Sequence, residues 1–201
     1  WSVDPGNQSY HRLEELMGEA LWDSSQGSGR WNLLTKNNFG HSTLTVNGEL
    51  HRAGARSTLI RSDERGDSPE ASFELAPLFG TLAEDAVRTF KRMPGDRLVV
   101  RDRIGLNDQT RSVTWQLVTR AEVELDSNRV ILHQDGRSME LKVRSNVSGL
   151  TRVVDLSPPP LPYDKDIEGL KRIEVTFLAT EASAEHLEIE AVMGRGGRAY
   201  V

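Results

Sequence analysis

From residue 41 onward, apolar and polar side chains alternate along short stretches separated by turn residues, and this period of two constrains the fold most. Such alternation is typical of β-strands that bury one face. The turn signals Pro94-Gly95-Asp96 and Asp135-Gly136 predict two hairpins, which join 85–93 to 97–104 and 128–134 to 137–144. The other strand candidates are the stretch beginning at residue 41 and residues 56–62, 70–76, 112–119, 121–125, 150–155, 170–180 and 185–193.

About twelve short strands, with no long helical pattern between them, predict an all-β antiparallel sandwich. Residues 1–40 read as irregular, with a short helix near 12–21 where Leu13, Met17 and Leu21 fall at helical spacing. Four prolines within 156–169 predict a stiff, extended connection. We see no internal boundary, so we expect residues 1–201 to form one domain.

Composition excludes several classes of protein. The net charge of −5 argues against a nucleic-acid-binding surface, which would be basic. No apolar run approaches the roughly 20 residues of a membrane span. The chain has no cysteine, which excludes disulfides and thiolate metal sites.

His41 is the residue that suggests chemistry most directly. It lies in Asn37-Asn38-Phe39-Gly40-His41-Ser42, at the mouth of an alternating strand, and the acidic loop Val3-Asp4-Pro5-Gly6 precedes it. An imidazole and a carboxylate share a divalent metal if the fold brings them together. A protein metal site usually has three such ligands, so we expect part of a larger protein. The start at Trp1 rather than Met also predicts a processed product or fragment. The competing interpretation is a partly buried histidine and a turn-forming aspartate.

These motifs together resemble a known family. The segments are Asp4-Pro-Gly-Asn-Gln-Ser-Tyr10, Leu13-Glu14, Trp22, Arg30-Trp31 and Asn37-Asn-Phe-Gly-His-Ser-Thr-Leu-Thr-Val-Asn-Gly48. Their order is similar to the β-sheet domain of heparinase II/III-like polysaccharide lyases, which carry an Asp-x-Gly loop, a Tyr, an Arg-Trp pair and a His-Asn-Thr-Leu-x-Val-x-Gly strand. The chain departs from that pattern at Ser42, where Asn is usual.

The resemblance implies a bacterial enzyme that cleaves a uronic-acid-containing polysaccharide, heparin-like, heparan-sulfate-like or alginate-like, by β-elimination. In that family an N-terminal (α/α) toroid precedes the β layers, and the substrate lies between them. Residues 1–201 would then be the C-terminal domain, with the toroid as its partner. Because the toroid carries much of the catalytic machinery, we expect this chain alone to be inactive. A periplasmic or secreted location is implied.

The resemblance also assigns site residues. Asp4 and His41 would bind a divalent metal, expected to be zinc, in a site left incomplete because the third ligand would precede residue 1. Tyr10 is the candidate catalytic residue, and the candidate substrate-binding residues are Arg30, Trp31 and Asn38. Each of these residues also has a structural alternative. Tyr10 would pack against the toroid, Arg30 would stabilise its loop, Trp31 would anchor a loop in the core, and Asn38 would form a turn. We expect Trp115 in the core, and His11, His51, His133 and His186 in solvent.

Two other classes remain open. A non-catalytic carbohydrate-binding sandwich would use Trp22, Trp31 and Tyr10 to stack on sugars. A structural domain would expose apolar surface around residues 1–40 for docking another domain. The paired Asp4 and His41 favour the lyase, because a pure binding module needs no such pair.

Overall fold

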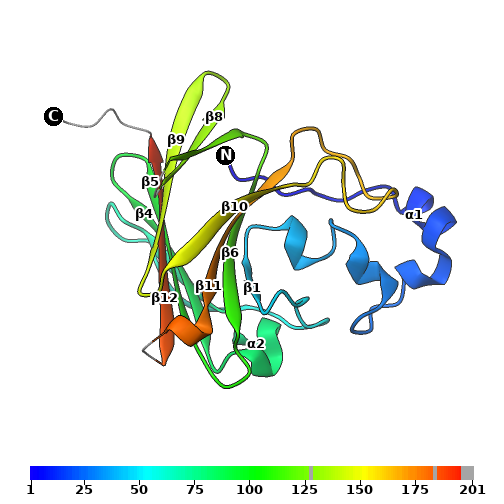
Figure 1. The fold of residues 1–201 in the computed structure, drawn as a ribbon, viewed down its shortest axis with the longest axis horizontal. Helices are drawn as coiled ribbons and strands as arrows, with labels where there is room; N and C mark the ends of the chain where they lie inside the picture. Colours follow the sequence, from blue (N-terminus) through cyan, green and yellow to red (C-terminus); the bar gives the residue numbers. More distant parts are fainter. Residues whose placement is uncertain (127–128, 183–184, 196–201) are drawn as a thin grey trace.

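In the computed structural model, two antiparallel sheets pack face to face as a sandwich (Figure 1). The structure describes residues 1–126, 129–182 and 185–195. The smaller sheet has the order β1 (Leu44–Val46), β6 (Ser112–Thr119), β11 (Lys171–Leu178) and β10 (Gly149–Asp155). The larger sheet has the order β2 (Thr58–Asp63), β3 (Glu70–Glu74), β4 (Ala86–Met93), β5 (Arg97–Gly105), β12 (His186–Arg195), β9 (Arg137–Ser145), β8 (Arg129–Gln134) and β7 (Glu122–Asp126).

The expected all-β sandwich is therefore confirmed, and so are both hairpins. The β4–β5 turn places Asp96 at a φ of 56°, and the β8–β9 turn places Asp135 at a φ of 52°. Aspartate tolerates this left-handed backbone, which the glycine beside each one adopts freely. The turn chemistry read from the sequence thus sets the register of both hairpins.

Alternation along the strands of the smaller sheet builds the core. Trp115 of β6 and its paired residue Val175 of β11 point toward the larger sheet and are almost fully buried. The intervening Gln116 and Glu174 point to the opposite face, yet they are also buried. Both faces of this sheet are therefore covered. The core position expected for Trp115 is confirmed.

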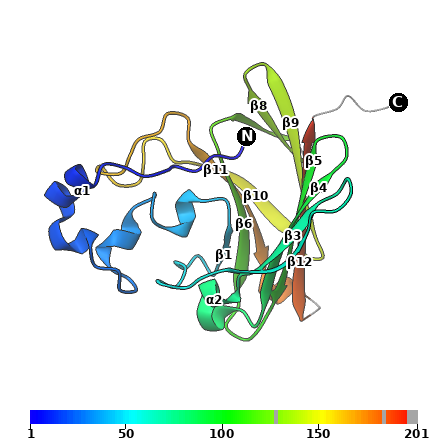
Figure 2. The same cartoon turned by 180° about the vertical axis from the view of Figure 1, so that it is seen from behind.

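The cover of that second face is the N-terminal segment, which forms a third layer (Figures 1 and 2). It contains α1 (Tyr10–Met17) and the 3₁₀ turns η1 (Gly18–Leu21), η2 (Gly29–Asn32) and η3 (Asn38–Gly40). The helix expected near 12–21 is confirmed in place, although its α-helical part ends at Met17 because Gly18 takes a φ of 54°. A small core of Leu13, Leu21 and Leu33 holds this layer together.

Two local expectations were wrong. The strand expected over 70–76 stops at Glu74, and α2 (Ala76–Phe79) follows, with a proline in its first turn where a missing N–H costs nothing. The remaining short turns are η4 (Gly80–Leu82) and η5 (Ala179–Glu181). The 156–169 connection is not simply extended, because Asp164 N donates to Leu161 O at 3.0 Å and closes a turn.

One ion pair is buried between the two sheets. Arg88 of β4 donates to Asp102 of β5 through Nε to Oδ1 at 2.7 Å and through Nη2 to Oδ2 at 3.0 Å. Their side chains are 7% and 0% exposed. Arg88 Nη1 also donates to Ser42 O at 3.4 Å, so the pair links the larger sheet to the start of β1.

We predict that Arg88→Ala lowers the free energy of unfolding by about 3–5 kcal/mol, because it leaves the Asp102 carboxylate buried without its cation. Urea denaturation measures this difference. The matched control is Arg101→Ala in the adjacent strand β5, which removes an exposed pair with Glu190 and should cost less than about 1 kcal/mol. Equal losses in the two variants would contradict the prediction.

Candidate functional site

The fold brings Asp4 and His41 together through one residue at the end of β6. Val3 N donates to Val118 O at 3.0 Å, and Val118 N donates to Ser42 Oγ at 2.9 Å. The Ser2 and Ser42 hydroxyls lie 3.0 Å apart. The segments before Asp4 and after His41 are thus attached to the same backbone unit, which explains how residues 37 positions apart meet.

Asp4 and His41 form a direct pair on the surface. Asp4 Oδ2 lies 2.7 Å from His41 Nδ1, and Gly6 N donates to Asp4 Oδ1 at 2.7 Å. Partial burial acts to raise the pKa of Asp4, but the hydrogen bonds from Gly6 and His41, with the charge of His41, outweigh it and leave the pKa below its usual range. The carboxylate is therefore held ionised in a fixed orientation.

Buried polar residues of β6 and β11 hold the backbone that carries His41. Gln116 Nε2 donates to Asn38 O at 2.5 Å and to His41 O at 3.0 Å. Arg172 Nη1 donates to Phe39 O at 2.5 Å, and its guanidinium carbon lies 5.5 Å from the centre of the Phe39 ring. Each carbonyl is held by a side chain whose own position is set by the sheet. The imidazole is consequently presented from a rigid backbone.

Glu174 in turn holds Arg172, since Arg172 Nε donates to Glu174 Oε1 at 2.7 Å. Arg152 of β10 donates to the other oxygen of the same carboxylate. Two guanidinium groups therefore share one buried carboxylate beneath η3. This arrangement satisfies the carboxylate and ties β10, β11 and the His41 segment together.

A hollow of about 340 Å³ opens beside His41. Its polar and aromatic wall consists of Trp31, Lys36, Asn37, Asn38, His41, Thr43, His51 and Arg52. Lys36 and Arg52 give the wall fixed positive charge. Cationic, amide and aromatic groups of this kind suit a ligand with acidic groups and hydroxyls.

Tyr10 lies next to this wall, where Lys36 ties it to the hollow. Lys36 Nζ donates to Tyr10 Oη at 2.9 Å and to Asn7 Oδ1 at 2.7 Å. The hydrogen bond from Lys36, followed by that from Arg30, lowers the pKa of Tyr10. The phenol is thus a better proton donor than a free tyrosine, and its own O–H is available to a ligand.

The two tryptophans of the N-terminal layer are anchored differently. Trp31 lines the hollow, and its Nε1 donates to Ser25 O at 2.9 Å. Trp22 stacks on Tyr10 with ring centres 5.5 Å apart and remains 58% exposed. Arg30 Nη1 donates to Leu21 O at 2.6 Å, which is the loop-stabilising alternative weighed for this residue.

Asn38 lines the hollow, but its side chain is committed within the protein. Its Nδ2 donates to Thr45 Oγ1 at 2.9 Å and to Glu49 O at 3.1 Å, and His51 N donates to its Oδ1 at 3.0 Å. Both amide hydrogens are therefore used, and only the second lone pair of the carbonyl oxygen is left for a ligand. Asn37 likewise acts as a turn residue, with Oδ1 accepting from Phe39 N at 2.9 Å.

The expectation that His51 is solvated was wrong. His51 is half-buried, lies 2.8 Å from Leu44 O through Nε2 and packs its ring edge-on against Phe79. Burial lowers its pKa, more than the contact with the Leu44 carbonyl raises it. The imidazole is thus held neutral in the wall of the hollow. His11 and His133 are exposed as expected, and His133 pairs with Glu124. His186 is half-buried and pairs with Asp85, so the expectation that it is solvated was also wrong.

Asp4 and His41 are the two candidate metal ligands. Carboxylate and imidazole are suitable ligands for zinc, but within the described ranges no three His, Cys, Asp or Glu side chains come together. Two ligands do not close a tetrahedral site. A metal here would need a further protein ligand from outside the described residues. The residues present therefore supply two of the four ligands of a tetrahedral site.

Sequence reasoning missed Lys36, Gln116 and Ser42. Gln116 had a detectable signal, because it is the one amide within the apolar run Val113-Thr-Trp-Gln-Leu-Val118. Ser42 was noted as a departure from the family pattern, yet its hydroxyl accepts the Val118 N–H that joins the two halves of the site. Lys36 gave no signal, since an isolated lysine in a loop is usually solvated.

Comparison with known proteins places the fold. No protein-family model matches the sequence, and no curated protein matches it. A heparinase III structure aligns with a TM-score of 0.62 and 15% identity, over 96% of this chain and 27% of that one. The heparan sulfate lyase HepC from Pedobacter heparinus aligns with a TM-score of 0.59 and 14% identity, over 98% and 28% of the two chains.

This chain therefore has the fold of a heparinase-like domain, and the resemblance expected from residues 1–48 is confirmed at the level of the fold. It spans about a quarter of the length of those chains. Among the described residues, no helix is long and apolar enough to cross a membrane.

We predict that Gly40→Ala displaces the His41 segment. A Cβ at Gly40 would lie 2.0 Å from the backbone oxygen of Leu34, so the backbone at Leu34 or at η3 has to shift. We expect the free energy of unfolding to fall by more than about 1 kcal/mol and the Asp4–His41 contact to be lost. Urea denaturation and the chemical shifts of the His41 ring report the two effects. Gly29→Ala is the control, because its Cβ would meet only ordinary contacts at 3.6 Å or beyond.

We predict that the carboxyl of Asp4 titrates below the usual aspartate range, and that His41→Ala moves the midpoint upward. A depressed pKa in the folded state means that the pair stabilises the protein above the unfolded pKa and loses this effect as pH falls through the folded pKa. The contribution should stay below about 1 kcal/mol, because Asp4 is 67% exposed. Carbon-detected NMR follows the midpoint, and His133→Ala is the control that should leave it unchanged.

Proposed function

We propose that this chain is the C-terminal β-sandwich domain of a bacterial polysaccharide lyase, and that residues 1–55 form one wall of its substrate cleft. The observation that carries the proposal is the convergence of Asp4, His41, Tyr10 and Trp31 on one end of a domain with a heparinase-like fold. The four residues come from separate segments of the N-terminal layer, Asp4 and His41 contact each other, and Gln116 and Arg172 of the smaller sheet hold the backbone that carries His41.

The reaction would be β-elimination at a uronic acid. A base removes the proton α to the carboxylate, the electron pair forms the new C=C bond, and the glycosidic C–O bond breaks as its oxygen takes up a proton. Negative charge grows on the uronate during this step, so cations near it stabilise the transition state. Lys36 and Arg52 in the wall of the hollow supply such charge.

In this proposal Tyr10 faces the substrate with its O–H, and Lys36 keeps that O–H in place and acidic enough to donate to a sugar oxygen. Trp31 forms an apolar wall against a sugar ring, Asn38 contributes its carbonyl oxygen, and Arg30 acts through the loop that it holds. The remaining acid and base groups would lie on the toroid.

Asp4 and His41 would hold a divalent metal, expected to be zinc, with a third ligand from the preceding part of the protein. When bound, the metal would fix the loops that line the cleft. The hydrogen bond between the two side chains already holds both loops in the required proximity.

A carbohydrate-binding domain without catalysis is the second candidate. The stacked pair of Tyr10 and the exposed Trp22 favours it, because a flat aromatic surface in solvent is typical of sugar-binding sites. An assay distinguishes the two candidates, because a carbohydrate-binding domain binds glycan without forming an unsaturated product.

We predict that the native-length protein produces the ultraviolet absorbance of an unsaturated uronate from at least one of heparan sulfate, chondroitin, hyaluronan and alginate. The 201-residue chain alone should produce none. In the native-length protein, His41→Ala should lower the rate at least about tenfold, and His133→Ala should not change it. Silence of the native-length protein on every polymer would contradict the lyase, and turnover by the 201-residue chain would contradict the placement of catalysis on the toroid.

A further inference from the structure

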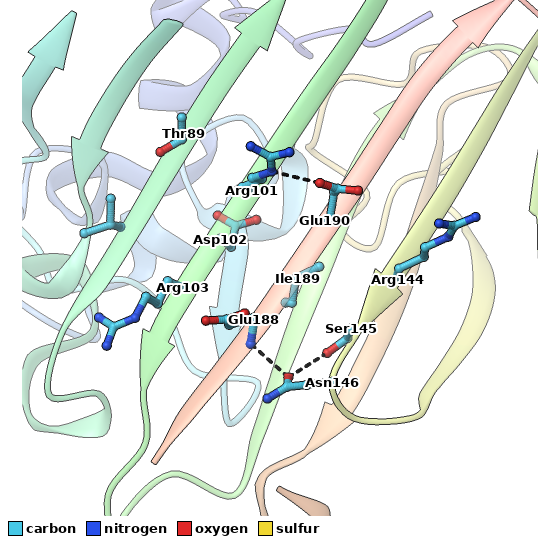
Figure 3. A pocket seen from close by; sticks show the side chains of 11 residues that line it. Thr89, Arg101, Asp102, Arg103, Arg144, Ser145, Asn146, Glu188, Ile189 and Glu190 are labelled. Atoms are coloured by element: carbon cyan, nitrogen blue, oxygen red, sulfur yellow. Dashed lines mark hydrogen bonds and ion pairs between the residues drawn. The ribbon is translucent and has the colours of Figure 1, made fainter. Parts of the chain in front are cut away.

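A second hollow lies on the opposite side of the molecule from His41. It has a volume of about 570 Å³ and is formed by the outer face of the larger sheet, where β4, β5, β12 and β9 run side by side (Figure 3). This volume is within the range of roughly 300–1,000 Å³ that is usual for small-molecule sites. Nothing in the proposed lyase chemistry uses this face.

The register of the sheet arranges the lining residues in two rows. One row runs Thr89, Arg101, Glu190 and Arg144 across the four strands. The next row runs Val87, Arg103 and Glu188. Neighbouring strands are about 4.8 Å apart, so Arg101 and Arg144 stand on either side of Glu190, about 10 Å from each other.

The charges in these rows are not all compensated. Arg101 Nε donates to Glu190 Oε2 at 2.8 Å, and Arg103 Nη1 donates to Asp85 Oδ1 at 3.3 Å. Across the described ranges, no hydrogen bond or ion pair engages the guanidinium of Arg144, which points away from Glu190 in Figure 3. Among the described residues, the side-chain carboxylate of Glu188 likewise makes no hydrogen bond or ion pair.

The groups left available form a complementary set. Arg144 offers a planar fork that binds a carboxylate or sulfate through two parallel hydrogen bonds. The carboxylate of Glu188 accepts hydrogen bonds from hydroxyls. Val87 and the aliphatic stems of the arginines offer apolar surface between them. Asn146 is fixed at the edge, since its Oδ1 accepts from Glu188 N at 3.0 Å and its Nδ2 donates to His186 O at 2.9 Å.

We propose that this hollow is a second, non-catalytic binding site for an acidic saccharide, with Arg144 binding the acidic group and Glu188 a hydroxyl. The anionic and hydroxyl-bearing character of the ligand follows from these side chains, whereas its assignment as a saccharide rests on the proposed function. A site on this face would hold one part of a polymer while another part lies in the cleft. Two weak sites on one chain raise the overall affinity for a long polymer.

The test is an NMR titration of the 201-residue chain with a heparan sulfate hexasaccharide, with maltohexaose as the neutral comparison. We expect amide shifts at residues 87–89, 101–103, 144–146 and 188–190 with the acidic sugar and none there with the neutral one. Arg144→Ala should weaken binding at this face at least about tenfold. Arg144→Lys should bind more tightly than Arg144→Ala but less tightly than the unchanged protein, because lysine keeps the positive charge and lacks the planar guanidinium. Since Arg144 has no partner within the described protein, its replacement should leave the fold intact.

Arg61→Ala is the matched control, because Arg61 is exposed on edge strand β2 of the same sheet and outside the hollow. It should leave the binding constant unchanged. Shifts confined to residues 31–55 would overturn this inference and leave the proposed function standing. Shifts at the outer face alone, together with a lyase assay that stays silent, would support the second site and overturn the lyase. Equal binding of maltohexaose would overturn the acidic specificity.

Discussion

The side chains of Gln116, Arg172 and Glu174 hold the N-terminal layer on the sandwich, and the candidate site depends on them. They project from the face of the smaller sheet that turns away from the main core, where apolar residues would ordinarily be expected beneath a covering layer. Because each must have its hydrogen bonds satisfied when buried, the covering segment has to place carbonyl groups at defined points. The carbonyls of Asn38, Phe39 and His41 occupy those points, and so the turn that presents the imidazole has little freedom.

The layer is also closed from its outer side. Gln8 Nε2 donates to Tyr163 O at 3.1 Å, and Lys165 N donates to Gln8 Oε1 at 2.9 Å. These bonds attach the 156–169 connection to the loop that contains Asp4. Asp164 Oδ1 accepts a hydrogen bond from Leu34 N at 3.1 Å, and this bond attaches the same connection to the loop that leads to His41. The burial of Asp164 raises its pKa, against the two backbone hydrogen bonds that lower it. One connection therefore restrains both loops that carry the metal-ligand candidates.

The sequence allowed the strands, the two hairpins and the position of the short helix to be predicted, because period two and turn residues are local signals. It also allowed Asp4 and His41 to be selected as a pair, through motif order. It did not allow the roles of Gln116 and Lys36 to be predicted. Gln116 donates to a carbonyl 75 positions away, and Lys36 donates to the phenol of Tyr10 at the start of α1, 26 positions away, so neither contact produces a periodic pattern in the sequence. The same reason applies to His51, whose burial depends on Phe79 and on the carbonyl of Leu44.

The strand β5 presents opposite chemistry on its two faces. Asp102 points inward to the buried Arg88, and through it to the backbone of Ser42, whereas Arg101 and Arg103 point outward into the second hollow. A slip of one residue in the pairing of β5 would exchange these faces, and it would place a guanidinium in the core and expose the carboxylate that Arg88 requires. A single-residue insertion or deletion in this strand should therefore be eliminated by selection, and the length of the β4–β5 turn at 94–96 is constrained for the same reason, because that turn sets the register of the strand.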